Sequence, residues 1–292
     1  MPTAQKVRRK RRDDSRGASR DNDPAETQIT QREIEDIEDR SGPRTPVIYE
    51  IVRRLGEEEM ARPVVSLWWS GVAAGLSISF SLLTQAILQT HLPDAPWRPL
   101  VADFGYSVGF VMVVMSRQQL FTESTVTGVL PVMAEFTWKN LIKLARMWGV
   151  VLTANLAGTL FAALFSTFTP VLDPQLYAGM LGISRQIVGH GWLEMFFKGI
   201  ASGYLIAAMV WLIPGAQTAQ IVVIVLMTYL IAVGQFMHII AGSVEGFLLV
   251  LNGELPWLTM ITGFVLPVLA GNIIGGTALF ALLAYAQVMK EI

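Results

Sequence analysis

Beyond residue 62 the chain consists largely of apolar runs of about 20 residues, the length that an α-helix needs to cross a bilayer. Only 15% of its 292 residues are charged, and the mean hydropathy is +0.48. The sequence therefore predicts an all-α polytopic membrane protein. Six spans are expected, near residues 65–89, 100–133, 146–168, 191–213, 219–252 and 257–287.

The second and fifth runs are interrupted halfway by polar residues. Leu120–Thr125 reads LFTEST and Gly234–His238 reads GQFMH. Hydrocarbon offers no water to unpaired N–H and C=O groups, so non-helical backbone at that depth persists only against protein or beside a hydrated path. We predict that the second and fifth helices are broken and that both breaks border a permeation path.

A weak internal repeat relates the two halves of the chain. Gly71–Gly75 (GVAAG) resembles Gly199–Gly203 (GIASG), and Asn155–Gly158 (NLAG) resembles Asn272–Gly275 (NIIG). Three spans, an odd number, separate the copies, so the second copy is expected to be inverted, giving a 3+3 inverted repeat. The glycine spacing fits close helix crossings. The same offsets place Thr122 opposite His238, so the two breaks should meet.

Charge sets the expected organisation and orientation. Residues 1–45 are predicted to be a disordered cytoplasmic tail, 46–64 a short amphipathic cytoplasmic segment, and 65–290 a six-helix transmembrane channel domain. Basic residues flank the first span and follow the second, which places both termini in the cytoplasm by the positive-inside rule. The connection over residues 169–190 is expected to be external.

Thr122 and His238 are the polar side chains that best fit such a path. Ionisable groups inside membranes are costly and usually face a cavity, although a lone histidine also serves as a hydrogen bond between helices. His238 offers an N–H or a proton to an anion, and the Thr122 hydroxyl replaces part of its hydration shell. Alternatively, Thr122 only satisfies its own backbone. Leu120, Phe121 and Phe236 are candidate apolar collars, with ordinary packing as the alternative.

The remaining charges at membrane depth have structural and functional interpretations. Lys198 lies four residues after Glu194, which favours an ion pair, and the alternative is a source of positive potential. Arg117 is expected to pair with Glu123 or to reach the interface, and the alternative is a direct electrostatic role toward the substrate. Glu245 is expected to satisfy backbone or a neighbouring helix.

Nothing in the sequence indicates catalysis. The chain has no cysteine and no recognisable motif for a metal, a nucleotide or a catalytic nucleophile. We predict that it is not an enzyme and that it uses no cofactor, no metal and no nucleic-acid partner.

Four stretches together resemble the formate/nitrite transporter family over about residues 48–290. They are LFTE at Leu120–Glu123, HIIA at His238–Ala241, LPVLAGNIIGG at Leu266–Gly276 and the glycine spacing of the first span. The run RQQLFTE at Arg117–Glu123 is similar to a divergent branch of that family. The resemblance implies an aquaporin-like protomer within a homopentamer in the inner membrane of a bacterium. It also implies one pore per protomer for formate, nitrite or a related small monovalent anion, and it maps the family's pore threonine and histidine to Thr122 and His238.

The chain departs from the family pattern near both pore residues. Ile239 and Gly242 stand where members typically carry Ser or Cys and Asn, and no lysine stands near Ile187, so Arg185 or Lys198 is the candidate substitute. The leading hypothesis is passage of a small weak-acid anion, with proton coupling at His238 as an option. The alternatives are an aquaporin-like neutral-solute channel, for which both Asn-Pro-Ala signatures are missing, and a non-conducting membrane scaffold that uses the charged tail for docking.

Overall fold

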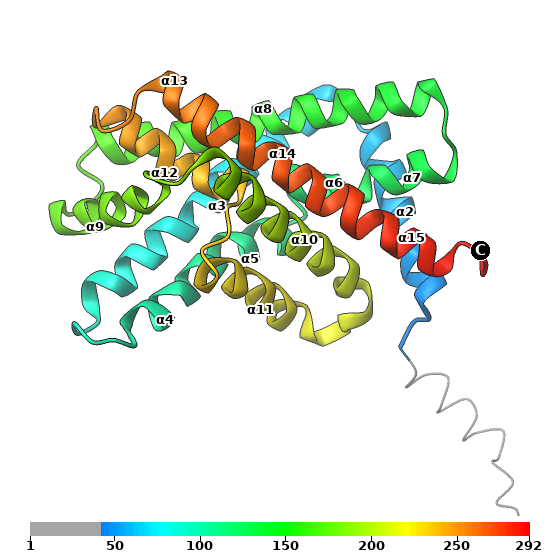
Figure 1. The fold of residues 1–292 in the computed structure, drawn as a ribbon, viewed down its shortest axis with the longest axis horizontal. Helices are drawn as coiled ribbons and strands as arrows, with labels where there is room; N and C mark the ends of the chain where they lie inside the picture. Colours follow the sequence, from blue (N-terminus) through cyan, green and yellow to red (C-terminus); the bar gives the residue numbers. More distant parts are fainter. Residues whose placement is uncertain (1–41) are drawn as a thin grey trace, which may run out of the picture. The chain divides into compact units, whose positions relative to one another are not determined.

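The computed structural model describes residues 42–292, and every regular element in that range is helical (Figure 1). Pro43–Ile292 form one unit by their internal contacts. The predicted tail, residues 1–45, lies outside the described residues except for its last four.

Six apolar segments carry the fold, as predicted. Five stretches are long and apolar enough to span a membrane: Val64–His91, Arg98–Met115, Trp138–Phe168, Trp192–Val233 and Trp257–Val288. The first and third of these are α3 and α8. The fourth comprises α10 (Trp192–Ala216) and α11 (Gln220–Val233), which are joined by the 3-10 turn η3 (Gln217–Ala219) and pack against each other. This stretch covers more than one predicted span: α10 is the fourth segment, and α11 with the shorter apolar helix α12 (Ile239–Leu251) is the fifth.

The second and fifth segments are broken, as the polar interruptions predict. The second runs through α4 (Arg98–Ala102), η1 (Asp103–Tyr106) and α5 (Ser107–Met115), and resumes as α6 (Phe121–Thr127) and α7 (Val129–Ala134). The fifth stops at the end of α11 and resumes as α12.

Both breaks begin with the same turn. Arg117 and Gln235 adopt left-handed backbone angles, with φ of 52° and 50°. The N–H of the next residue then reaches back to an earlier carbonyl, from Gln118 to Val113 at 3.0 Å and from Phe236 to Ile231 at 2.9 Å. This is the hydrogen bond that caps the C-terminus of a helix in a Schellman motif. It gives a partner to one of the carbonyl groups that the helix end would otherwise leave unpaired.

The last span is one continuous helical segment with two π-helical stretches. It consists of α13 (Trp257–Thr259), η4 (Met260–Val265), α14 (Leu266–Ile274), η5 (Gly275–Ala281) and α15 (Leu282–Val288). Pro267 lies at the start of α14 and has no N–H for the carbonyl four residues earlier, which explains the irregular turn before it.

Two equivalent helix crossings confirm the inverted repeat. A Cβ on Gly75 of α3 would collide with the backbone carbonyl oxygen of Asn155 in α8, and a Cβ on Gly203 of α10 with that of Asn272 in α14. Without side chains at these positions the two backbones of each pair approach closely, as the small-residue spacing predicts.

One helix was not anticipated. The connection between α8 and α10 contains α9 (Pro174–Ser184), followed by the turn η2 (Arg185–Ile187). The Asp173 side chain caps its first turn by accepting from the Gln175 N–H at 2.8 Å, with proline at the first helical position. The buried face of α9 packs against α3 and α12, so this connection covers one end of the broken segment.

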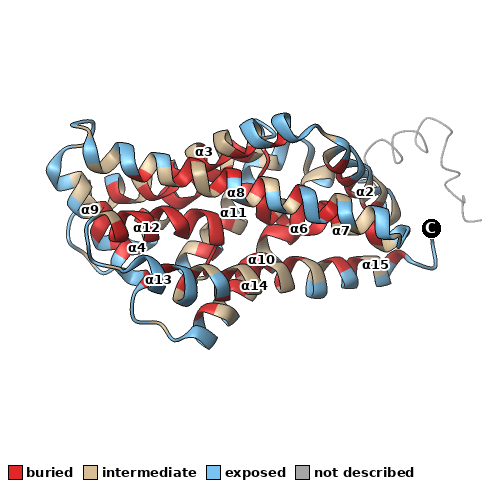
Figure 2. Ribbon diagram, turned by 90° about the horizontal axis from the view of Figure 1, so that it is seen from above, coloured by how far each residue is buried: buried red, intermediate tan, exposed pale blue. Residues whose placement is uncertain are grey.

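Burial runs through the middle of the molecule (Figure 2). Almost every residue of α12 is buried, as expected for a helix that is apolar apart from Ser243 and Glu245. Large apolar side chains on outer faces, such as Phe161 in α8 and Val222 in α11, are 57% and 66% exposed, which suits contact with lipid. The helix α2 (Thr45–Ala61) instead buries a stripe of Tyr49, Val52, Gly56 and Met60, and packs against α7 and α10.

Candidate functional site

In the first half, the side chain of Asn155 in α8 holds the broken segment. Its Oδ1 accepts the Phe121 N–H at 2.9 Å, and its Nδ2 donates to the carbonyls of Gln119 at 2.9 Å and Gly71 at 2.8 Å. One buried amide therefore satisfies both backbone groups that the break leaves open and ties them to α3.

In the second half, Asn272 in α14 makes the same three bonds. Its Oδ1 accepts the Ile239 N–H at 2.9 Å, and its Nδ2 donates to the carbonyls of Met237 at 2.9 Å and Gly199 at 2.8 Å. Phe121 and Ile239 are therefore equivalent positions, and His238 corresponds to Leu120. The expected register, with Thr122 as the counterpart of His238, is wrong by two residues because the offset inside the breaks is 118 rather than 116.

Although they are not equivalent, Thr122 and His238 do meet. Thr122 Oγ1 lies 2.7 Å from His238 Nε2, and both side chains are buried. Each belongs to the start of a half-helix, with Thr122 in the first turn of α6 and His238 at the N-cap of α12. The expected meeting of the two breaks is confirmed.

The hydrogen bonds of His238 fix its neutral tautomer. Nδ1 accepts the Ala241 N–H at 3.1 Å, so the ring proton resides on Nε2 and is donated to Thr122 Oγ1. The Thr122 hydroxyl then keeps its own proton to give to another acceptor. The pair thus presents an O–H donor, backed by an N–H, at the point where the two half-helices meet.

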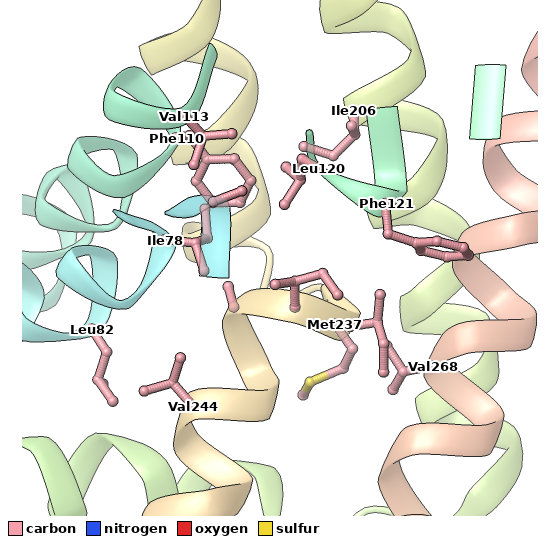
Figure 3. Packing of buried hydrophobic residues seen from close by; sticks show 14 of the residues in the cluster. Ile78, Leu82, Phe110, Val113, Leu120, Phe121, Ile206, Met237, Val244 and Val268 are labelled. Carbon is pink, nitrogen blue, oxygen red and sulfur yellow. The ribbon is translucent and has the colours of Figure 1, made fainter. Parts of the chain in front are cut away.

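Apolar side chains surround this pair. Phe110 of α5 stands edge-on to the His238 ring, with centroids 5.0 Å apart and planes at 76°. Leu120 lies on the Phe110 side, whereas Phe121 points away from it (Figure 3). The Phe121 ring instead packs against Trp148 of α8, with centroids 5.9 Å apart. Of the three candidate collars, Leu120 and Phe121 are both buried in the hydrophobic core.

A cavity of about 240 Å³ leads to His238 from the end of the molecule that carries α4 and α9. Phe236, the third candidate collar, lines it together with Met237 and His238. Its polar lining includes Gln85 of α3, Asp103 of η1, Gln186 and His190 near η2, Gln235 of the second break and Glu245 of α12. Asp103 Oδ1 accepts from the Gln85 side chain at 2.6 Å.

A second polar group lies on the α2 side of the break. Glu59 of α2 accepts from Thr127 at 2.5 Å and from the Gln119 side chain at 3.1 Å. Burial is the largest influence on this carboxyl and raises the pKa of Glu59. The helix ahead of the first span is thereby bonded directly to the broken segment.

Two of the predicted electrostatic residues, Lys198 and Arg185, are paired with carboxylates. Lys198 pairs with Glu194 at 3.0 Å, which confirms the structural interpretation. Arg185 forms a two-bond pair with Glu254, at 2.7 and 2.8 Å, which raises the pKa of Arg185 and lowers that of Glu254. Both cations are thus engaged by carboxylates, and neither lines the cavity.

The expected pair between Arg117 and Glu123 does not form. The left-handed turn at Arg117 directs its side chain outward, where it is exposed. Glu123 faces inward, and its Oε1 is buried without a hydrogen-bond partner among residues 42–292. Across the described part of the chain no cluster of histidine and acidic side chains could hold a metal ion.

Sequence reasoning missed several residues that shape the site. Asn155 and Asn272 appear in the repeat, but the sequence does not show that their side chains hydrogen-bond to the backbone of the two breaks, because this depends on the direction of each side chain. Glu245 was expected to satisfy backbone or a neighbouring helix, but its carboxyl lines the cavity and bonds to no described residue. The available signal was position, because Glu245 follows His238 by two helical turns on one face of α12.

Comparison with known proteins is consistent with this architecture. The family model described as formate/nitrite transporter matches residues 46–286. The inner membrane protein YfdC of Escherichia coli strain K12 is 46% identical over 260 residues, covering 89% of this chain and 84% of that protein. The formate channel FocA of Haemophilus influenzae is 33% identical over 162 residues, covering 54% and 56% of the two chains.

Solved structures share the fold. One is a pentameric formate channel with formate bound, with a TM-score of 0.67 and 23% identity, covering 78% of this chain and 98% of that chain. Another is an ion channel of the same family, with a TM-score of 0.68 and 20% identity, covering 83% and 98%. By the family model and the relative at 46% identity, this polytopic membrane protein belongs to the formate/nitrite transporter family.

Proposed function

We propose that the protein is a membrane channel for small monovalent weak-acid anions, such as formate, nitrite or a related monocarboxylate. Its family membership and the names of its relatives, several of which are formate channels, support this assignment. The solved relative with formate bound is pentameric, which supports a homopentamer with one pore in each protomer. The relative from the inner membrane of Escherichia coli supports the same location here. The distribution of basic residues along the sequence supports cytoplasmic termini.

The contact between Thr122 Oγ1 and His238 Nε2 carries the proposal. It joins the two broken helices where His238 lines a cavity, and it leaves the proton of the Thr122 hydroxyl for donation to a solute that reaches this contact. A carboxylate or nitrite oxygen is a strong acceptor for such a donor. The buried surroundings make that bond stronger than it would be in water and discourage larger hydrated ions.

Apolar side chains complete the proposed selective region. Phe110 stands edge-on to the His238 ring, Phe236 lines the cavity, and Leu120 is buried at the N-cap of α6. Such a constriction excludes bulk water and passes only small solutes that shed their hydration shell. Phe121 packs against Trp148 of α8 and in this way helps to fix the position of the next residue, Thr122.

The test is flux into proteoliposomes containing the purified protein, with formate, acetate, nitrite and glycerol as solutes. We expect uptake of the three acids and little swelling in glycerol. Thr122→Ala and His238→Ala should each reduce acid flux by about tenfold, the equivalent of one lost hydrogen bond to a charged group. The exposed residues Thr153 and His91 provide matched controls, Thr153→Ala and His91→Ala.

Three results would contradict the proposal. These are absence of flux for all three acids, rapid glycerol passage that indicates a neutral-solute channel, or unchanged flux in both pore variants. Retained biological function without any flux would favour a scaffold.

A further inference from the structure

The cavity that leads to His238 is acidic. Asp103 and Glu245 are its two carboxyl groups, and none of its lining residues is a lysine or an arginine. The carboxyl of Asp103 is occupied by Gln85. That of Glu245 accepts no hydrogen bond from any described residue, although it lies within the membrane-spanning bundle. Glu245 is partly buried and faces the cavity, and an ionisable side chain at membrane depth without a protein partner needs an explanation, because such groups are costly inside a membrane.

His238 is poorly placed to serve as a proton donor. Its Nε2 proton is held by Thr122, and its Nδ1 accepts the Ala241 N–H that caps α12. Loss of the Nε2 proton would leave an anionic ring unless Nδ1 were protonated, and an N–H at Nδ1 would face the Ala241 N–H. Both ring nitrogens therefore hold the site together, and each proton transfer would break one of these bonds.

We propose that Glu245 is the residue that gives a proton to the incoming acid anion. The inference rests on the proposed function and specifies which group carries the proton. The O–H bond of the Glu245 carboxyl breaks and an O–H bond forms on the substrate carboxylate, leaving Glu245 ionised and the substrate neutral. The neutral acid crosses the Thr122–His238 constriction, and a hydronium ion from the solution that fills the cavity returns a proton to Glu245 and becomes water.

The surroundings of Glu245 favour this assignment. The other titratable groups that line the cavity are Asp103 and Tyr106 of η1, His190 after η2, and His238 at the start of α12. His190 is engaged by Glu194 at 2.8 Å. The residues lining the cavity from α3, α9, η2 and α11 include none that titrates. With no cation near it, Glu245 gains nothing from remaining ionised, and a passing carboxylate is a suitable proton acceptor.

The experiment compares Glu245→Gln with the wild-type protein in proteoliposomes loaded with a pH dye. In the wild type, formate uptake at pH 7 should acidify the lumen. Glutamine preserves the shape of the side chain but has no proton to give, so formate flux at pH 7 should fall by about tenfold or more. At low external pH a larger share of the formate is already protonated in the external solution, so the flux of Glu245→Gln should approach that of the wild type. Glu245→Asp should retain a measurable part of the pH 7 flux.

Two matched variants separate proton transfer from cavity charge. Asp103→Asn removes the other carboxyl of the cavity, and Glu58→Gln changes an exposed acid on α2. Glu58→Gln should keep the pH 7 flux within about twofold of the wild type, because it lies outside the cavity. Asp103→Asn changes the charge of the cavity and with it the size of the flux, but it should keep the wild-type dependence of flux on external pH, because Asp103 does not carry the proton. An Asp103→Asn profile like that expected for Glu245→Gln, or a wild-type pH profile in Glu245→Gln, overturns the assignment.

Infrared spectroscopy tests Glu245 without relying on flux. A protonated-carboxyl band that is absent in Glu245→Gln should weaken when formate is added to the wild type. If the wild type transports no acid, the proposed function is wrong. The infrared band still shows, independently of flux, whether Glu245 is protonated. A spectrum identical in Glu245→Gln and wild type shows that the residue holds no proton and overturns the inference.

Discussion

Asn155 and Asn272 make the same three hydrogen bonds in opposite halves of the protein, with lengths that agree to 0.1 Å. Each amide accepts from the first residue of a half-helix and donates to the carbonyl two residues before it. Each also bonds to the glycine-bearing helix that packs against its own. The breaks that bring Thr122 and His238 together are therefore held by side chains of unbroken helices.

Replacement of either asparagine should destabilise the protein strongly. Asn155→Ala would leave the Phe121 N–H and the carbonyls of Gln119 and Gly71 unpaired in the core, at a cost of about 2–4 kcal/mol. Asn272→Ala should cost a similar amount. Thermal unfolding in detergent measures both.

The control for this prediction is Asn140→Ala, at a position where the side chain bonds only near the exposed start of α8. It should lower stability by less than about 1 kcal/mol. An equal loss of stability in all three variants would show that the hydrogen bonds of Asn155 and Asn272 stabilise the protein no more than those of Asn140.

The glycine crossings provide a second prediction. In Gly75→Ala and Gly203→Ala the new methyl group meets a backbone carbonyl, which cannot move aside as a flexible side chain can. Each variant should lose about 1–3 kcal/mol, and α3 and α8 or α10 and α14 should separate slightly. Gly149→Ala in α8 is the control, because nothing lies within 4 Å of its added Cβ, and it should be neutral or slightly stabilising. Similar melting temperatures for all three variants would contradict the close approach.

The sequence predicts the six spans, the two breaks and the inverted repeat because each follows from hydropathy or from chain order. It does not predict which way the side chains of a break point. Both breaks turn at residues with positive φ, Arg117 and Gln235, which are not glycines and therefore carry no compositional sign of a left-handed turn. That turn exposes Arg117, separates it from Glu123 and sends Phe121 toward Trp148.

The same limit applies to the cavity. Glu245 stands out in the sequence as a charge inside an apolar span, but a helix offers it several directions. The helix α9 packs against α3 and α12 and lines the cavity through Ile183. The connection over residues 169–190 has few charges and reads equally well as a loop, although Asp173 and Pro174 form a recognisable helix start.

Acid should loosen α2. Arg53 and Arg54 hydrogen-bond to Glu50 and lower the pKa of its carboxyl from 4.5 to about 2. A depressed pKa means that the bonds stabilise the fold above the unfolded value and are lost as the pH falls from about 4.5 to about 2. The pair is partly exposed, so the effect should stay below about 1 kcal/mol. After correction for the intrinsic pH dependence of amide exchange, the protection of the α2 amides should fall over that interval in the wild type. In Glu50→Gln the protection should already be lower at neutral pH and should not change with acid, and a parallel response of both proteins would rule out this carboxyl as the cause.

The hydrogen bonds of His238 predict its tautomer. Nδ1 accepts from Ala241 and Nε2 donates to Thr122, so nitrogen NMR of the labelled protein in lipid should show a bare Nδ1 and a protonated Nε2. Thr122→Ser keeps the acceptor and should preserve both signals. Thr122→Val removes it and leaves the Nε2 proton without a partner, which should shift that signal and increase ring mobility. A protonated Nδ1 in the wild type would mean that the cap on α12 opens readily, and His238 would then be free to carry the proton that the geometry assigns to Glu245.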